Sequence, residues 1–137
     1  MDRTKGPLTV LFAALCWTLL VGMGRVPGPE VPLPDVDFRA TIIDSQDIAT
    51  ECRNVSWDGQ TFFSGLRGKG AVSIPFEKVR KVEFVGEGGE GLADFQVTLK
   101  SGEVIGVSLE AHKKLTGTTS FGSYRIDAIH IKEIVFR

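Results

Sequence analysis

The chain has 137 residues, of which 42% are hydrophobic, and this is the size and composition of one folded domain rather than of a disordered polypeptide. Its formal charge is −1, from 16 basic and 17 acidic residues, so no overall positive field favours nucleic acid or an anionic membrane surface. Sixteen glycines, six prolines and nine phenylalanines, beside many β-branched residues, favour short strands joined by turns over long helices.

The N-terminal segment is typical of a secretory signal peptide. Basic residues near the amino terminus precede an apolar run over residues 8–21. This run is shorter than the roughly 20 residues that a membrane-spanning helix needs. Gly22 and Gly24 are the small residues that a signal peptidase reads, so we expect cleavage after Gly24 and a signal peptide over residues 1–24. The alternative is an uncleaved anchor, which would be the chain's one contact with a membrane.

The next segment is rich in proline. Four of the six prolines lie between Pro27 and Pro34, which predicts an extended spacer over residues 25–36. Cleavage of the signal peptide would leave Cys52 as a single cysteine, so no internal disulfide is expected. We expect Cys52 to act as a small buried hydrophobe, and a reactive or intermolecularly paired thiol is the alternative.

The remaining residues, 37–137, repeat. Residues 37–42 recur as residues 94–99 at an offset of 57, whereas the later parts of the two copies match at an offset of 52. The later matches include Gly65 with Gly117 and Ile74 with Ile126. One deletion in the second copy accounts for the two offsets. The sequence therefore predicts a first copy over 37–84, a connector over 85–93 and a second copy over 94–136.

Both copies have the alternation of apolar and polar residues that predicts strands. Neither copy is long enough to bury a stable core alone, so we expect an all-β fold in which two tandem repeats form one pseudo-symmetric sandwich or barrel. The three-residue step from Val79 to Val82 predicts a short helical turn before the last strand of the first copy. The predicted strands lie near residues 37–44, 50–57, 60–66, 70–75, 80–85, 93–100, 103–110, 115–120, 122–127 and 132–137.

The second copy contains a glycine turn at Ser101-Gly102, a threonine-rich strand from Leu115 and a closing Ile131-Lys132-Glu133-Ile134-Val135-Phe136. In these motifs it resembles a small β-module of exported bacterial proteins. The resemblance extends over both copies and implies an all-β fold and a place in the periplasm or cell envelope of a bacterium. It implies no shared catalytic residues.

The sequence predicts no catalytic, cofactor-binding or metal-binding residues. Residues 86–91 match the glycine pattern of dinucleotide-binding loops, but a predicted strand follows them instead of the required helix. The carboxylates of Glu87, Glu90 and Asp94 have no fixed geometry for calcium. His112 and His130 have no ligand spacing for zinc.

Three aromatic residues are the candidate contacts for a partner: Trp57, Phe62 and Phe63. Packing in the core is the favoured alternative for them, because small β-domains need aromatic residues inside. The leading hypothesis is a non-enzymatic, exported module that binds or scaffolds another envelope protein, with no cofactor and no nucleic acid. The alternative is a β-barrel that binds a small molecule or a metal near Trp57 or His112, and a hydrolase ranks third.

Overall fold

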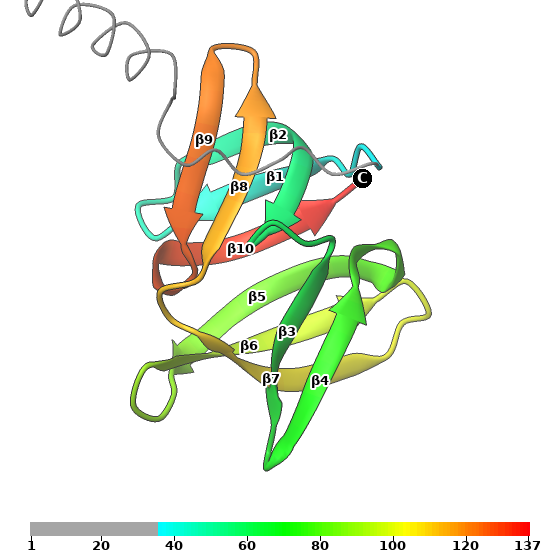
Figure 1. The fold of residues 1–137 in the computed structure, drawn as a ribbon, viewed down its shortest axis with the longest axis vertical. Helices are drawn as coiled ribbons and strands as arrows, with labels where there is room; N and C mark the ends of the chain where they lie inside the picture. Colours follow the sequence, from blue (N-terminus) through cyan, green and yellow to red (C-terminus); the bar gives the residue numbers. More distant parts are fainter. Residues whose placement is uncertain (1–35) are drawn as a thin grey trace, which may run out of the picture. The chain divides into compact units, whose positions relative to one another are not determined.

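The computed structural model describes residues 36–137, which form ten strands and two 3-10 turns (Figure 1). The signal peptide expected over 1–24 and the spacer expected over 25–36, apart from Val36, lie outside the described residues. Within the described part of the chain, no helix is long and apolar enough to cross a membrane. The elements are β1 (Ala40–Asp44), β2 (Ala49–Trp57), β3 (Phe62–Arg67), β4 (Gly70–Pro75), η1 (Phe76–Lys78), β5 (Val79–Glu87), β6 (Leu92–Leu99), β7 (Val104–Glu110), β8 (Lys114–Thr119), β9 (Gly122–Asp127), η2 (Ala128–His130) and β10 (Ile131–Phe136).

All ten strands pair in one sheet, in the order β4-β3-β7-β6-β5-β10-β1-β2-β8-β9. Every pairing is antiparallel. Figure 1 shows that the sheet curls, because the hairpins β3–β4 and β8–β9 turn away from the direction of the central strands. The all-β class expected from the sequence is therefore confirmed.

The observed strands lie within three residues of every predicted boundary, and β4 and β9 have the predicted bounds. The short helical turn expected before the last strand of the first copy is confirmed as η1, which ends at Lys78, whereas Val79 and Val82 themselves lie in β5. Their three-residue step has another cause. The pairing of β5 with β6 slips between Val79 and Lys81, and this bulge lets both valines point into the core.

Buried residues from the earlier and the later strands form a single hydrophobic core. Its largest members are aromatic. The ring of Phe63 lies 5.3 Å from that of Trp57 and 4.8 Å from that of Phe76, and Phe136 of β10 lies 5.0 Å from Phe76. Edge-on and tilted packing of this kind adds to the stabilisation that burial of the rings provides.

Gly65 and Gly117 lie inside strands β3 and β8. An added Cβ on Gly65 would lie 2.5 Å from the backbone oxygen of Ser108, and one on Gly117 would lie 2.7 Å from the Cβ of Cys52. Both glycines thus permit close approach of neighbouring strands, β3 to β7 and β8 to β2.

Candidate functional site

Three arginines lie side by side on the outer face of the sheet, on β2 and immediately beside β1 and β10. Ala40 pairs with Phe136 of β10 and with Cys52 of β2. On the same side of all three paired residues the adjacent residue is an arginine: Arg39 precedes Ala40, Arg53 follows Cys52 and Arg137 follows Phe136. Arg39 is therefore the neighbour of both Arg137 and Arg53, and the backbone N–H of Arg137 donates to the carbonyl of Arg39 at 3.0 Å. We call Arg39, Arg53 and Arg137 the arginine rung.

Two members of the arginine rung have carboxylate partners. Arg39 lies 3.1 Å from the carboxylate of Asp37. Arg137 forms an ion pair with Glu51 and donates a hydrogen bond to the Thr41 hydroxyl at 3.0 Å. Among residues 36–137, Arg53 has no ion pair of its own. One positive charge of the rung is therefore left uncompensated by a direct partner in this part of the chain.

The Asp37 carboxylate is held in its ionised form. The backbone N–H of Asn54 donates to it at 2.8 Å, and this hydrogen bond is the main reason that the pKa of Asp37 is lowered from its ordinary value. Arg39 and Arg53 lower the pKa of Asp37 further through their charges. Asp37 is thus a fixed counter-charge to Arg39 at neutral pH.

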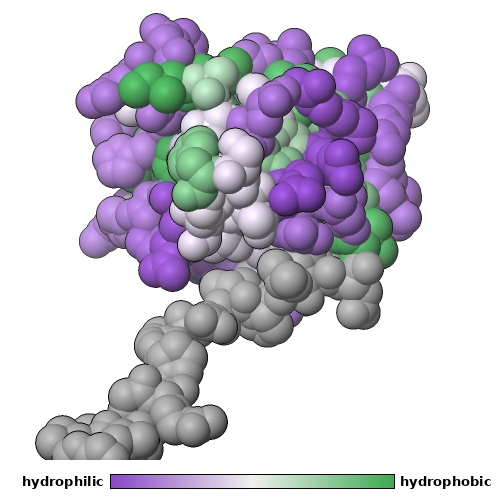
Figure 2. Space-filling view, turned by 90° about the horizontal axis from the view of Figure 1, so that it is seen from above, coloured by the Kyte–Doolittle hydropathy of each residue, from purple (hydrophilic) through white to green (hydrophobic). Residues whose placement is uncertain are grey.

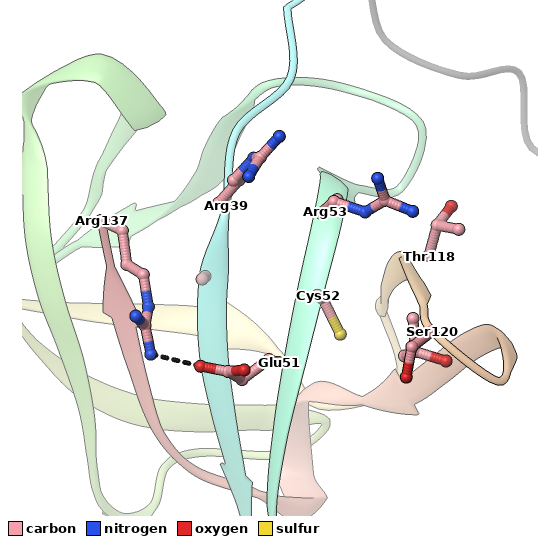
Figure 3. Close-up of a pocket in the computed structure, with 9 residues that line it drawn as sticks. Arg39, Glu51, Cys52, Arg53, Thr118, Ser120 and Arg137 are labelled. Atoms are coloured by element: carbon pink, nitrogen blue, oxygen red, sulfur yellow. Dashed lines mark hydrogen bonds and ion pairs between the residues drawn. The ribbon is translucent and has the colours of Figure 1, made fainter.

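The arginine rung borders a surface hollow of about 280 Å³, which we call the arginine hollow. In Figure 3, Arg53 extends from β2 toward Thr118, and Arg137 turns to Glu51. Thr118 is the cross-strand partner of Arg53, which places a hydroxyl of β8 beside the guanidinium. Thr119 and Ser120 also line this edge: the Thr119 hydroxyl donates to the Gly122 carbonyl at 2.7 Å, and Ser120 lies in the turn between β8 and β9.

Cys52 also lines the arginine hollow, but its side chain is buried. Burial raises the pKa of the thiol from 9.0 to about 11. Because the thiolate is the reactive form, Cys52 is an unreactive thiol at neutral pH. This answers the question that the sequence left open.

A second hollow, of about 440 Å³, lies over β5, β6, β7 and β3. We call it the apolar hollow, because three of the exposed large hydrophobic residues line it: Leu66, Val85 and Val104, which are 37%, 66% and 49% exposed. Asp94, Gln96 and Ser108 are its polar members, and the Ser108 hydroxyl donates to the Asp94 carboxylate at 2.7 Å.

The aromatic residues expected to contact a partner are largely internal. Trp57 and Phe63 are each 1% exposed, so a partner cannot reach them in the folded domain, and only Phe62 is partly exposed. The Nε1 of Trp57 is buried without a hydrogen-bond acceptor among the described residues. The alternative of core packing is correct for Trp57 and Phe63.

The residues weighed for metal binding remain dispersed over the described part of the chain. Across residues 36–137, no group of three or more histidine, cysteine, aspartate or glutamate side chains is placed to hold a metal ion. His112 lies on the surface, 3.6 Å from the carboxylate of Asp127. The pKa of Asp127 is lowered mainly by its hydrogen bond from Lys114.

No sequence pattern predicted the arginine rung or the exposed position of Phe121. The rung depends on strand register, because its three members come from distant parts of the chain. Phe121, which follows Ser120 in the β8–β9 turn, is 79% exposed. Figure 2 looks onto the end of the domain at which this turn lies, and it shows separate hydrophobic patches on a largely hydrophilic surface.

Taken together, the described residues define a small all-β domain with surface hollows on one continuous sheet. A family described as "Uncharacterised protein" matches residues 34–137, and the chain belongs to this family. The match agrees with the resemblance to a β-module that has no named activity. Comparisons with curated proteins and with solved structures found no match.

Proposed function

We propose that this protein is a non-enzymatic interaction module that is exported to the bacterial cell envelope and binds another envelope protein. The proposed contact surface is the outer face of β10, β1, β2 and β8 together with the β8–β9 turn. The supporting observation is that Phe121, 79% exposed, follows Ser120, which lines a hollow bordered by three arginines. Arginine and large aromatic residues are enriched in protein interfaces and supply most of their binding energy.

The second part of the proposal is that the domain arose by duplication of a five-stranded unit. If each strand from β1 to β5 is exchanged with the strand five places later, β6 to β10, the resulting strand order is the observed order read from the opposite edge of the sheet. In addition, β3 and β4 begin and end 52 residues before β8 and β9, the offset found in the sequence. A bulge also follows the first residue of both β5 and β10.

The duplicated unit would account for the two glycines at close approaches. Gly65 and Gly117 are 52 residues apart, and each contacts a strand of the opposite copy. In this proposal, the surface over β10, β1, β2 and β8 keeps charged residues where the surface over β5, β6, β7 and β3 has apolar residues. The two hollows would then be diverged versions of one ancestral surface.

Export is tested by the intact mass of the protein recovered from the envelope of the producing bacterium. We expect a mass that lacks residues 1–24, as cleavage after Gly24 requires. Recovery of the whole chain from the membrane fraction would favour the uncleaved anchor instead. Recovery from the cytoplasm alone would contradict the proposed location.

The interaction surface is tested by photo-crosslinking in living cells. A photoreactive phenylalanine analogue replaces Phe121, and a matched analogue replaces Ser101, an exposed turn residue between β6 and β7. We expect one discrete adduct from position 121 and none from position 101. Thr118→Trp, which fills the arginine hollow, should abolish the adduct, whereas Thr98→Trp, at a similarly half-buried position on β6, should not.

Loss of the adduct in both tryptophan variants, or identical adducts from both crosslinking positions, would contradict the proposed surface. The folded state of each variant is checked by its urea unfolding curve. A variant that unfolds like the parent protein but loses the adduct supports a direct contact at the hollow.

A second candidate function, the binding of a small apolar molecule, is favoured by the apolar hollow. Its volume of about 440 Å³ lies in the range of small-molecule sites. Its combination of apolar residues with the hydrogen-bonded Asp94–Ser108 pair is also typical of such sites. Methyl resonances of Leu66, Val85 and Val104 test it against a set of apolar fragments. Shifts that saturate and disappear in Val104→Asp would favour this candidate, and shifts that do not saturate would exclude it.

A further inference from the structure

We infer that Arg53, together with the hydroxyls of Thr118 and Ser120, forms a binding site for a single carboxylate group, supplied by an acidic segment of the partner. This inference rests on the proposed function, because it specifies the chemistry of the partner at the same surface. It assigns separate tasks to the three members of the arginine rung.

The first argument is the charge balance of the rung. Asp37 compensates Arg39, and Glu51 compensates Arg137. Arg53 is the member that lacks an ion pair within the described residues, so the side chains of the rung and its two carboxylate partners sum to one positive charge. A monoanionic carboxylate neutralises that excess, whereas a phosphate dianion would leave a negative charge next to Asp37 and Glu51.

The second argument is the geometry around Arg53. The strand pairing sets Thr118 directly opposite Arg53, and Ser120 lines the same hollow two residues further along the chain. Figure 3 shows the Arg53 side chain reaching across toward these two residues. A planar guanidinium offers parallel N–H donors to the two oxygens of a carboxylate, and nearby hydroxyls can donate to the remaining lone pairs.

The third argument is that the neighbouring pairs hold the site in place. The Asp37 carboxylate accepts a hydrogen bond from the backbone N–H of Asn54, the residue after Arg53, at 2.8 Å. Arg137 is fixed by Glu51 and by the Thr41 hydroxyl. Arg53 is thus the guanidinium of the rung that can turn to an incoming ligand without breaking an ion pair within residues 36–137.

Glu51 therefore limits the affinity of the site. Replacing it with glutamine leaves Arg137 without its carboxylate, and a second guanidinium then becomes available at the hollow. The inference predicts a gain of affinity for this variant.

The experiment measures the binding of a fluorescently labelled hexaglutamate peptide with blocked ends to the full chain, by fluorescence anisotropy. Hexaglutamine serves as the uncharged control peptide. We expect Arg53→Gln to weaken hexaglutamate binding about tenfold, the loss of one charge-assisted contact. Glu51→Gln should strengthen it by about threefold, since an exposed charge contributes less. Arg80→Gln, the same charge change on β5, should leave it unchanged.

The source of the anion is distinguished by competition at matched ionic strength. Acetate should compete with the peptide more strongly than inorganic phosphate, and phosphatidylglycerol vesicles should not bind in a manner that depends on Arg53. Stronger competition by phosphate, Arg53-dependent vesicle binding, or equal peptide binding by Arg53→Gln and the parent protein would each overturn the inference. If any of these results is obtained while the adduct at position 121 persists, the carboxylate site is contradicted and the proposed interaction function is still supported.

Discussion

The arginine hollow and the apolar hollow lie over corresponding stretches of the sheet but differ in chemistry. Counting outward from the central pair of β5 and β10, one hollow lies over β10, β1, β2 and β8, and the other lies over β5, β6, β7 and β3. Arginines and hydroxyls line the first, whereas exposed Leu66, Val85 and Val104 line the second. The comparison teaches that core residues set the shape of such a surface, while a few outward-facing residues set what it can bind.

The largest expected effect comes from separating the early strands from the late strands. Each hollow includes a pairing between an early and a late strand, β2 with β8 or β3 with β7. A fragment of residues 36–88 therefore contains neither hollow in full and lacks half of the core. We expect it to show no cooperative urea transition by circular dichroism. A monomeric fragment that unfolds cooperatively would contradict the shared core.

The next effect compares the two close approaches. Gly65→Ala should destabilise the domain by about 3 kcal/mol, because the new Cβ meets the backbone oxygen of Ser108, which cannot move aside. Gly117→Ala should cost less, about 2 kcal/mol, because the first atoms in its way belong to the side chain of Cys52. Gly86→Ala is the control, since nothing lies within 4 Å of an added Cβ there. Urea unfolding measures all three variants, and an equal loss at Gly86 would refute the packing argument.

A chemical probe then reports on the floor of the arginine hollow. The Cys52 thiol has a pKa of about 11 in the folded domain and about 9.0 when exposed. At pH 8 the thiolate population is therefore about a hundredfold lower in the folded state. We expect modification of Cys52 by iodoacetamide to be slower by at least about that factor than in the urea-unfolded chain. Comparable rates in the two states would show that the thiol is accessible after all.

The smallest effect concerns Asp37, which belongs to the arginine region alone. Its pKa is lowered by the Asn54 N–H and by Arg39 and Arg53, so its contribution to stability is present above the unfolded pKa, near 3.8. That contribution is lost as the pH falls through the lower, folded pKa. The stability difference between the parent protein and Asp37→Asn should thus shrink below about pH 4. Urea midpoints measured from neutral pH to acid test this, and a difference independent of pH would contradict it.

The sequence predicted local structure better than it predicted the surface. The bounds of β4 and β9 could be predicted because a glycine begins each strand, apolar residues alternate within it, and Pro75 or Asp127 ends it. The outward faces could not be predicted in the same way. Arg39, Arg53 and Arg137 become neighbours only through the register of three strands, and no local pattern encodes that register.

The position of Trp57 also depends on long-range contacts that the local sequence does not predict. Its sequence neighbourhood is polar, with Ser56 before it and Asp58 after it, which left open whether the indole faces outward. Long-range packing against Phe63 decides the matter, and the indole lies in the core. Contacts between distant residues thus determined both the buried aromatics and the exposed arginines.

The position of β10 has a consequence for the order in which the polypeptide can assemble during synthesis. This strand lies between β5 and β1, so without residues 131–136 the sheet divides into two separate blocks. A nascent chain therefore cannot complete its tertiary structure until its last strand has emerged, and local pairings alone cannot bridge the gap. Such an arrangement leaves this domain with an unclosed sheet until residues 131–136 have been synthesised.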